Sequence, residues 1–193
     1  MAKREGRPVA VGLVGATGLV GRSILQALEQ QRFPVGELRL WAGRRSAGRR
    51  LPFRGRRIRA RELGPSEFAG CRLVFFSGTE GEKGASRAFA RAAIDAGAVV
   101  IDNGADYRME PWVPLVVPEV NPGDLKGHRG LIANPNCSTI QLVAALAPVH
   151  RRLGLKRIVV STYQSVSGAG RAGLETLRDE MQNAKCRNQN PAF

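Results

Sequence analysis

The chain has 193 residues, of which 43% are hydrophobic and 24% charged; this excludes an intrinsically disordered chain and fits one globular domain with part of another. Basic residues outnumber acidic ones by 30 to 16, and the formal net charge of +14 favours a polyanionic or phosphate-bearing partner. No apolar run is long enough to cross a membrane and the charged N-terminus lacks a signal-peptide core, so we expect no membrane association and a cytoplasmic location.

Short apolar runs alternate with segments that repeat apolar residues at helical spacing. The runs have the lengths of buried strands, at residues 9–14, 37–42, 73–77, 98–102, 131–134 and 157–163. The helical patterns cover residues 19–31, 85–96, 138–153 and 172–184. This alternation predicts an α/β fold with a Rossmann-like, doubly wound parallel sheet that is covered on both faces.

A glycine-rich turn separates the first predicted strand from the first predicted helix. Glycines allow a tight turn and a close backbone approach, and the N–H groups that begin the helix point at an anion. Because the pyrophosphate of a dinucleotide needs both features, the position of this turn indicates a dinucleotide site. The candidate cofactor-binding residues in the turn are Gly15, Thr17, Gly18, Leu19, Val20 and Gly21.

The end of the second predicted strand indicates which dinucleotide is bound. NAD-binding folds place an acidic residue at this position, where it binds the ribose 2′-hydroxyl. Residues 38–42 contain no acid, and Arg44, Arg45 and Ser46 follow. Guanidinium groups and a hydroxyl suit a 2′-phosphate, so the sequence favours NADP, with Arg45 and Ser46 as ligands. The alternative is that these arginines are only surface residues.

Arginines are densest between residues 44 and 61. We interpret this segment as a solvated loop and hairpin in an arginine-rich chain. The basic residues are not interleaved with exposed aromatic residues and no nucleic-acid-binding motif is present, so nucleic acid is not the partner we expect. The alternative from another functional class is a non-catalytic nucleotide- or nucleic-acid-binding module that uses this segment.

One of the three cysteines stands in a special context. Cys71, Cys137 and Cys186 are far apart and form no CxxC pair, which argues against a disulfide framework and a metal site. Cys137 follows a strand and a proline and lies in the first turn of a predicted helix, where the helix dipole and unpaired N–H groups favour a thiolate. Cys71, just before the strand at 73–77, fits a buried structural residue. We therefore predict Cys137 as a nucleophile, against the alternative of an ordinary core cysteine.

Several separate blocks of the sequence resemble the aspartate-semialdehyde dehydrogenase family, and they occur in the same order as in that family. Residues 15–21 look like that family's cofactor loop and residues 45–48 like its contact with the 2′-phosphate. Residues 134–141, NPNCSTIQ, match its nucleophile motif and form the most specific block. The blocks at 102–109, 114–121 and 161–170 extend the resemblance along nearly the whole chain.

The resemblance implies an NADP-dependent phosphorylating oxidoreductase that interconverts aspartyl phosphate and aspartate semialdehyde through a thioester on Cys137, in lysine, threonine and methionine biosynthesis. It also implies that Arg108 and Asn136 bind substrate or phosphate, that Gln164 positions the substrate beside the thiol, and that Ser77 contacts the cofactor. N-acetyl-glutamyl-phosphate reductase, which shares the fold and the thioester chemistry, is the alternative. Residues 104–108 lean slightly towards it, whereas residues 136–138 and Gln164 lean away from it.

This chain departs from the family in length and at two loops. Family members are about twice as long, so we expect an NADP-binding domain at 1–135 and the incomplete start of a catalytic and dimerisation domain at 136–193. The rest of the family's length supplies a histidine acid–base, a carboxylate-binding arginine and most of the dimer interface. We therefore expect a truncated or split enzyme that is weakly active or inactive alone, as a homo-oligomer or with a complementing C-terminal chain. Gly104 and Ala105 replace two serines, and Glu80 and Glu82 lie near the expected cofactor path; either change could weaken anion binding.

Overall fold

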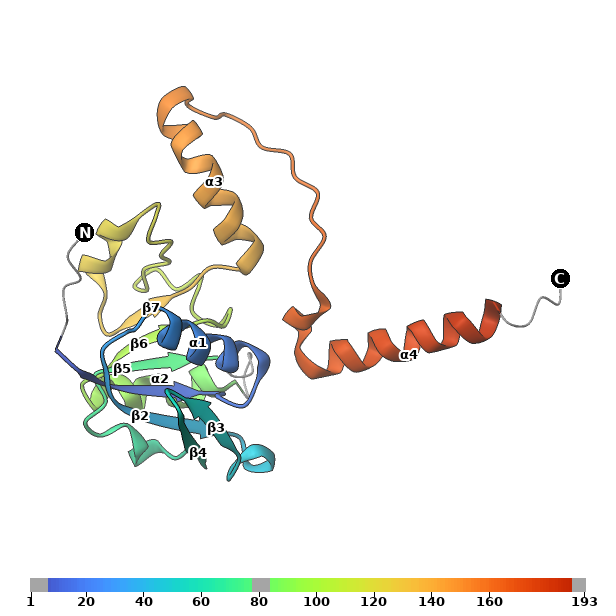
Figure 1. Cartoon of the computed structure of the whole chain (residues 1–193). Coiled ribbons are helices and arrows are strands. Elements are labelled where there is room, and N and C mark those ends of the chain that lie inside the picture. The colour runs from blue at the N-terminus through green and yellow to red at the C-terminus, as the bar shows by residue number, and fades with distance from the viewer. Residues whose placement is uncertain (1–6, 78–83, 189–193) are drawn as a thin grey trace. The chain divides into compact units, whose positions relative to one another are not determined.

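A seven-stranded sheet forms the centre of the first part of the chain in the computed structural model, which describes residues 7–77 and 84–188 (Figure 1). The strands are β1 (Val9–Val14), β2 (Val35–Ala42), β3 (Arg50–Phe53), β4 (Arg56–Glu62), β5 (Leu73–Phe76), β6 (Val99–Asp102) and β7 (Leu131–Ala133). They lie in the order β3-β4-β2-β1-β5-β6-β7, and neighbours are parallel except β3 and β4. The chain leaves β1 towards β2 and later returns to the other side of β1 at β5, which confirms the predicted doubly wound arrangement.

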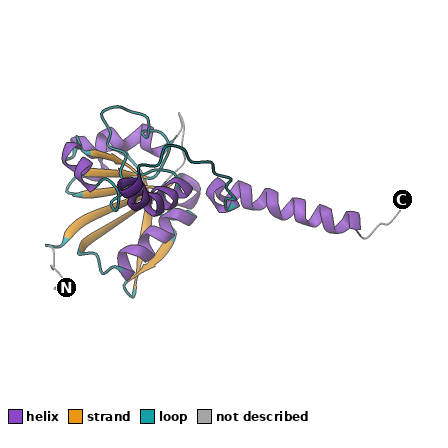
Figure 2. Cartoon of the chain, turned by 90° about the horizontal axis from the view of Figure 1, so that it is seen from above, coloured by secondary structure: helices purple, strands orange, loops and turns teal. Residues whose placement is uncertain are grey.

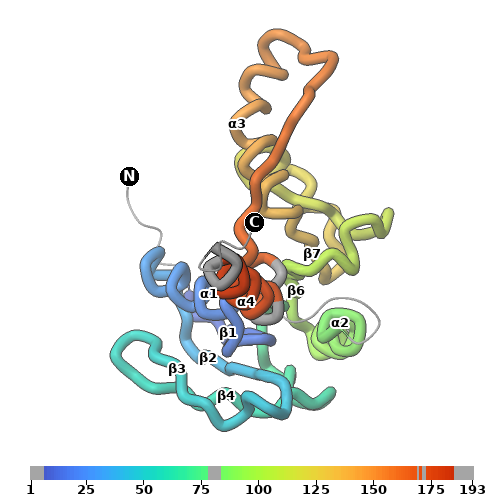
Figure 3. The backbone as a smooth tube through the Cα atoms, turned by 90° about the vertical axis from the view of Figure 1, so that its right-hand side faces the viewer, coloured from blue at the N-terminus to red at the C-terminus, as the bar shows by residue number. Residues whose placement is uncertain are grey.

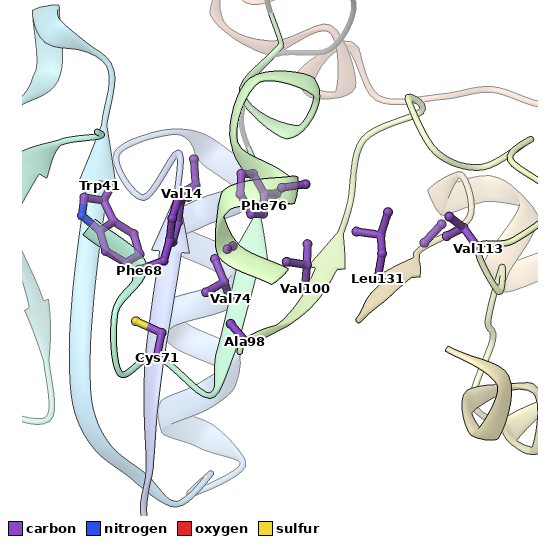
Figure 4. Close-up of a cluster of buried hydrophobic side chains, with 13 residues drawn as sticks. Val14, Trp41, Phe68, Cys71, Val74, Phe76, Ala98, Val100, Val113 and Leu131 are labelled. Carbon is purple, nitrogen blue, oxygen red and sulfur yellow. The ribbon is translucent and has the colours of Figure 1, made fainter. Parts of the chain in front are cut away.

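Helices α1 (Leu19–Gln30) and α2 (Ala85–Asp95) lie on opposite faces of the sheet (Figures 2 and 3). Helix α1 connects β1 to β2 and α2 connects β5 to β6, and these two connections run in opposite directions along the sheet. Because such connections are right-handed, the two helices are placed on opposite faces. Each helix covers its own apolar cluster. Leu25 and Leu28 of α1 pack with Leu13 and Leu40, whereas Ala90 of α2 belongs to the cluster drawn in Figure 4.

An aromatic group fills the cluster on the side of α2. Trp41 and Phe68 are both fully buried, and their rings meet edge to face with centroids 5.2 Å apart. A Cβ on Gly12 would lie 2.4 Å from the Trp41 ring. Gly12, within β1, is therefore needed for packing against Trp41.

The arginine-rich segment forms the predicted loop and hairpin. A 3-10 turn, η1 (Arg44–Ser46), follows β2, and β3 and β4 are joined by Arg54 and Gly55. Leu51 and Phe53 of β3 are buried in the cluster on the side of α1, so apolar residues hold this hairpin to the sheet.

Three further helical segments follow: η2 (Pro65–Phe68) comes before β5, η3 (Pro122–Gly127) comes before β7, and α3 (Cys137–Leu153) comes after it. The first unit of the chain, Met1–Leu155, ends just after α3. The second unit, Lys156–Phe193, contains η4 (Val166–Ala169) and α4 (Gly170–Asn188), which is longer than the predicted helix at 172–184. Among the described residues, no helix has both the length and the apolar character that crossing a membrane requires.

The strand predicted at residues 157–163 is wrong, because this segment has no regular secondary structure. Its β-branched composition is typical of a strand, but a strand also needs a neighbour to accept and donate its backbone hydrogen bonds. In the part of the chain that the structure describes, no strand pairs with this segment, and Val159 and Tyr163 are exposed.

Candidate active site

The carboxyl ends of the parallel strands lie at one edge of the sheet, and the predicted site segments of the first unit each follow one of these strands. The glycine turn follows β1, Arg45 and Ser46 follow β2, Ser77 follows β5, Arg108 lies in the loop after β6, and Asn136 and Cys137 follow β7. Open α/β sheets bind ligands at this edge, beside the point where the strand order reverses. That point is β1, so the topology brings these segments to the edge where a dinucleotide site is expected.

The turn between β1 and α1 has the tight backbone that a phosphate site requires. Gly15 has a positive φ of 78°, and the N–H groups of Gly15 and Ala16 both donate to the carbonyl oxygen of Trp41 at 3.0 Å. A Cβ on Gly21 would lie 2.4 Å from the carbonyl oxygen of Gly15. Glycine at position 21 therefore lets the first turn of α1 pack directly on the loop.

The start of α1 is suited to an anion. Helix geometry leaves the N–H groups of Leu19, Val20 and Gly21 without intrahelical acceptors. Gly18 is the N-cap residue and provides no capping side chain, and the first turn contains no acidic residue. The positive end of the helix dipole is therefore not neutralised by its own sequence, so these residues fit a dinucleotide pyrophosphate.

The other cofactor candidates lie within this turn or after the strands β5 and β2 that flank β1. Ser77 ties the end of β5 to the end of β1, because its hydroxyl and its N–H both donate to the carbonyl oxygen of Val14, at 2.8 and 3.0 Å. Arg45 is exposed and Ser46 half-buried in η1, while Thr17 is half-buried within the turn. The acidic residues Glu80 and Glu82 lie outside the described residues.

Cys137 is the first residue of α3, and it is exposed. Asn136 is the N-cap of this helix, and its Oδ1 accepts a hydrogen bond from the N–H of Ser138 at 3.0 Å. Cys71, in contrast, is buried as predicted, and burial raises the pKa of its thiol. The two thiols therefore differ in environment in the way that the sequence pattern indicates.

Arg108 lies between the ends of β6 and β7. Its Nε donates to the carbonyl oxygen of Asn134 at 2.9 Å and its Nη2 donates to that of Asn103 at 3.1 Å. The side chains of these two asparagines also meet, with Nδ2 of Asn134 donating to Oδ1 of Asn103 at 2.6 Å. The guanidinium group is thus held beside the segment that leads to Cys137.

Sequence reasoning did not select Asn103, Asn134, Asp102 or Ser86 as site residues. Asp102 is fully buried at the end of β6, and the hydroxyl of Ser86 donates to its Oδ1 at 2.6 Å. The sequence did contain a signal for Asp102, because this acidic residue ends the otherwise apolar strand predicted at 98–102. A buried carboxylate needs hydrogen-bond partners, so its neighbours in the fold were worth seeking.

Gln164 belongs to the second unit, where its side chain is exposed, and the position of that unit relative to the first is not determined.

A cavity of about 1100 Å³ lies along β2 and β4, bordered by Arg39, Arg59 and Arg61. None of the predicted site residues lines this cavity, so it does not identify the candidate active site.

Comparison with known proteins identifies the class to which this fold and site belong. The NAD-binding domain of semialdehyde dehydrogenases matches residues 10–128, and the dimerisation domain of the same enzymes matches residues 146–192. The chain is therefore a semialdehyde dehydrogenase family protein. Within that class, it belongs to the aspartate-semialdehyde dehydrogenase family.

Three relatives illustrate the similarity. The chain is 46% identical to aspartate-semialdehyde dehydrogenase of Bacillus subtilis over 177 residues, covering 92% of this chain and 50% of the relative. The crystal structure of aspartate-semialdehyde dehydrogenase II from Vibrio cholerae complexed with ASA is 43% identical and superposes with a TM-score of 0.87, covering 97% of this chain and 55% of that one. The NADP complex of the Candida albicans enzyme is 30% identical with a TM-score of 0.62, covering 77% and 48%. The chain thus spans about half the length of its relatives.

Proposed function

We propose that this chain binds NADP and carries the nucleophile of an enzyme that interconverts aspartyl phosphate and aspartate semialdehyde. The observation that carries the proposal is the exposed thiol of Cys137 at the first turn of α3, on the same sheet edge as the glycine turn. The relatives solved with ASA and with NADP support the choice of substrate and cofactor. Cytoplasmic amino-acid biosynthesis is the proposed setting, where a free thiol stays reduced.

In this proposal, the residues of the chain have separate tasks. The start of α1 binds the pyrophosphate and Ser77 the neighbouring part of the cofactor, while Arg45 and Ser46 bind the 2′-phosphate. When bound, NADPH supplies the hydride that converts the acyl group to the aldehyde.

Cys137 performs the acyl transfer. Its Sγ attacks the carbonyl carbon of aspartyl phosphate, an S–C bond forms, the C–O bond to phosphate breaks, and phosphate leaves. Arg108 and Asn136 bind the phosphate or substrate, Gln164 positions the substrate, and backbone N–H groups around Cys137 stabilise the oxyanion. The thiolate is restored when the aldehyde is released.

We further propose that residues 1–135 form the NADP-binding domain and that residues 136–193 begin the catalytic and dimerisation domain. Full turnover also requires an acid–base group and a grip on the substrate carboxylate, which we assign to the part of the relatives' length that this chain does not span. We expect NADP binding by this chain, little or no turnover, and assembly as a homo-oligomer or with a complementing chain.

Acyl transfer to Cys137 tests the proposed function. Mixing the chain with aspartyl phosphate should release no more than about one equivalent of phosphate per chain and add one aspartyl group to Cys137, because acylation precedes hydride transfer. Intact-mass and peptide-mass spectrometry would locate the added group. The Cys137→Ala variant should form no adduct, whereas Cys71→Ala should retain it. An NADP-binding chain without any adduct on Cys137 would contradict the proposed function, and rapid NADP-dependent turnover would show that the acid–base group lies within this chain.

The choice between NADP and NAD gives a second test. Arg45→Ala should raise the Kd for NADP by about 10- to 100-fold, because a hydrogen bond to a charged group contributes about 1.5–3 kcal/mol. The Kd for NAD, which has no 2′-phosphate, should stay within about two-fold. Isothermal titration calorimetry measures both constants. Arg57→Ala, which removes an exposed arginine from β4, is the control for net charge. Equal losses in the two variants would leave Arg45 without a specific role.

A further inference from the structure

A buried carboxyl group anchors the loop that contains Arg108. Asp102 is fully buried, and its Oδ1 accepts hydrogen bonds from the hydroxyl of Ser86 at 2.6 Å and from the N–H of Gly104 at 3.1 Å. Ser86 lies in the first turn of α2, where the helix dipole favours a nearby negative charge. One oxygen atom therefore joins the start of α2 to the start of the loop after β6.

The same loop contacts the first turn of α2 at two further points. Nη2 of Arg87 donates to the carbonyl oxygen of Asp106 at 2.8 Å, and the hydroxyl of Tyr107 donates to the carbonyl oxygen of Ser86 at 3.4 Å. The guanidinium group of Arg87 also lies over the Tyr107 ring, 5.2 Å from the ring centroid. Residues 103–108 are thus fixed at both ends against α2.

The far side of this loop faces the segment that leads to Cys137. The N–H of Asn134 donates to the carbonyl oxygen of Asp102 at 2.8 Å, and Asn103 and Arg108 form the side-chain bonds to Asn134 described above. Asn134 is three residues before Cys137. A continuous set of hydrogen bonds therefore runs from Ser86 and Asp102, through the loop, to the strand end that carries the thiol.

We propose that Asp102 is a positioning residue that, together with Ser86, holds Arg108 and the Asn134–Cys137 segment in the geometry needed to bind phosphate beside the thiol. This inference rests on the proposed function for the role of the phosphate, but the placement of the loop can be measured independently of it.

Fold stability alone does not account for a carboxyl group at this position. Oδ2 of Asp102 is buried and has no hydrogen-bond partner among the described residues, which carries a desolvation penalty. Burial raises the pKa of Asp102, and the hydrogen bonds from Ser86 and Gly104 oppose that shift only in part. The stability that this group contributes is therefore greatest at low pH and falls as pH rises through its folded pKa.

The test compares three variants of the full chain with the wild type. Asp102→Ala removes the acceptor, Ser86→Ala removes its donor, and Asp102→Asn keeps an acceptor oxygen without the charge. Ser23→Ala is the matched control, because Ser23 is an exposed helical serine that bonds only to its own helix, at Leu19. Hydrogen–deuterium exchange measures the placement of residues 103–110 and 134–138. The concentration of inorganic phosphate that halves alkylation of Cys137 by iodoacetamide measures the phosphate site.

In Asp102→Ala and Ser86→Ala we expect faster exchange in both segments and at least a ten-fold higher half-protecting phosphate concentration. Asp102→Asn and Ser23→Ala should stay within two-fold of the wild type. The Kd for NADP should stay within two-fold of the wild-type value in all four variants. A general loss of structure would instead raise this Kd. Unchanged exchange in Asp102→Ala, or no rescue by Asp102→Asn, would overturn the inference. If phosphate fails to protect the wild type while exchange still responds to Asp102→Ala, the positioning of the loop stands and the proposed function fails.

Discussion

Replacing Gly21 with alanine should abolish measurable NADP binding, with a rise in Kd of at least about 100-fold. The added Cβ would lie 2.4 Å from the carbonyl oxygen of Gly15 and 2.8 Å from the Cα of Ala16, and both are backbone atoms that cannot rotate away. The first turn of α1 must therefore move off the loop, and its N–H groups move with it. Such overpacking should also lower the free energy of unfolding by about 1–3 kcal/mol.

The matched control for this change is Gly43→Ala, in the neighbouring loop. Gly43 has an ordinary φ of −65°, and a Cβ there would meet nothing within 4 Å. This variant should bind NADP with the wild-type Kd and unfold at the wild-type denaturant concentration. Fluorescence titration with NADPH and urea unfolding measure the two quantities. Wild-type NADP affinity in Gly21→Ala would mean that the start of α1 does not hold the pyrophosphate.

Iodoacetamide should alkylate Cys137 about 100-fold faster than Cys71 in the folded chain at pH 8, because only the exposed thiolate reacts. Cys137 is exposed at the start of α3, whereas Cys71 is 2% exposed in the cluster around Trp41 and Phe68. Burial raises the pKa of Cys71, so this thiol stays protonated at a pH where an ordinary cysteine begins to ionise. Peptide mapping after timed quenching measures each rate separately.

Unfolding provides the control for this comparison. In concentrated urea both thiols meet solvent, and the two rates should become similar. If Cys71 reacts as fast as Cys137 in the folded chain, the environment of Cys137 has no special character and the case for a nucleophile at that position is lost.

Local patterns in the sequence were sufficient for most of the elements. The apolar run at residues 9–14 became β1 with the predicted bounds, and the helix predicted at 138–153 became α3. These assignments succeed because side-chain periodicity and glycine or proline boundaries act over a few residues. The segment at 157–163 shows the limit of such patterns, since its strand composition has no paired neighbour in the described part of the chain.

The hydrogen bonds of the site could not be predicted in this way. Ser86 and Asp102 are 16 residues apart, and Asn103 and Asn134 are 31 apart, yet each pair lies within hydrogen-bond distance. Their meeting depends on β6 lying between β5 and β7 and on α2 packing across that part of the sheet. No local pattern encodes this order of strands.

The sequence by itself determined the α/β class, the glycine turn at the start of α1 and the position of Cys137 in the first turn of a helix, because each depends on neighbours in the chain. Only the tertiary structure decided that Gly12 makes room for Trp41, that Asp102 anchors the loop of Arg108, and that the site segments share one edge of the sheet. These features depend on strand order and on packing between distant residues, which are decided when the whole core forms.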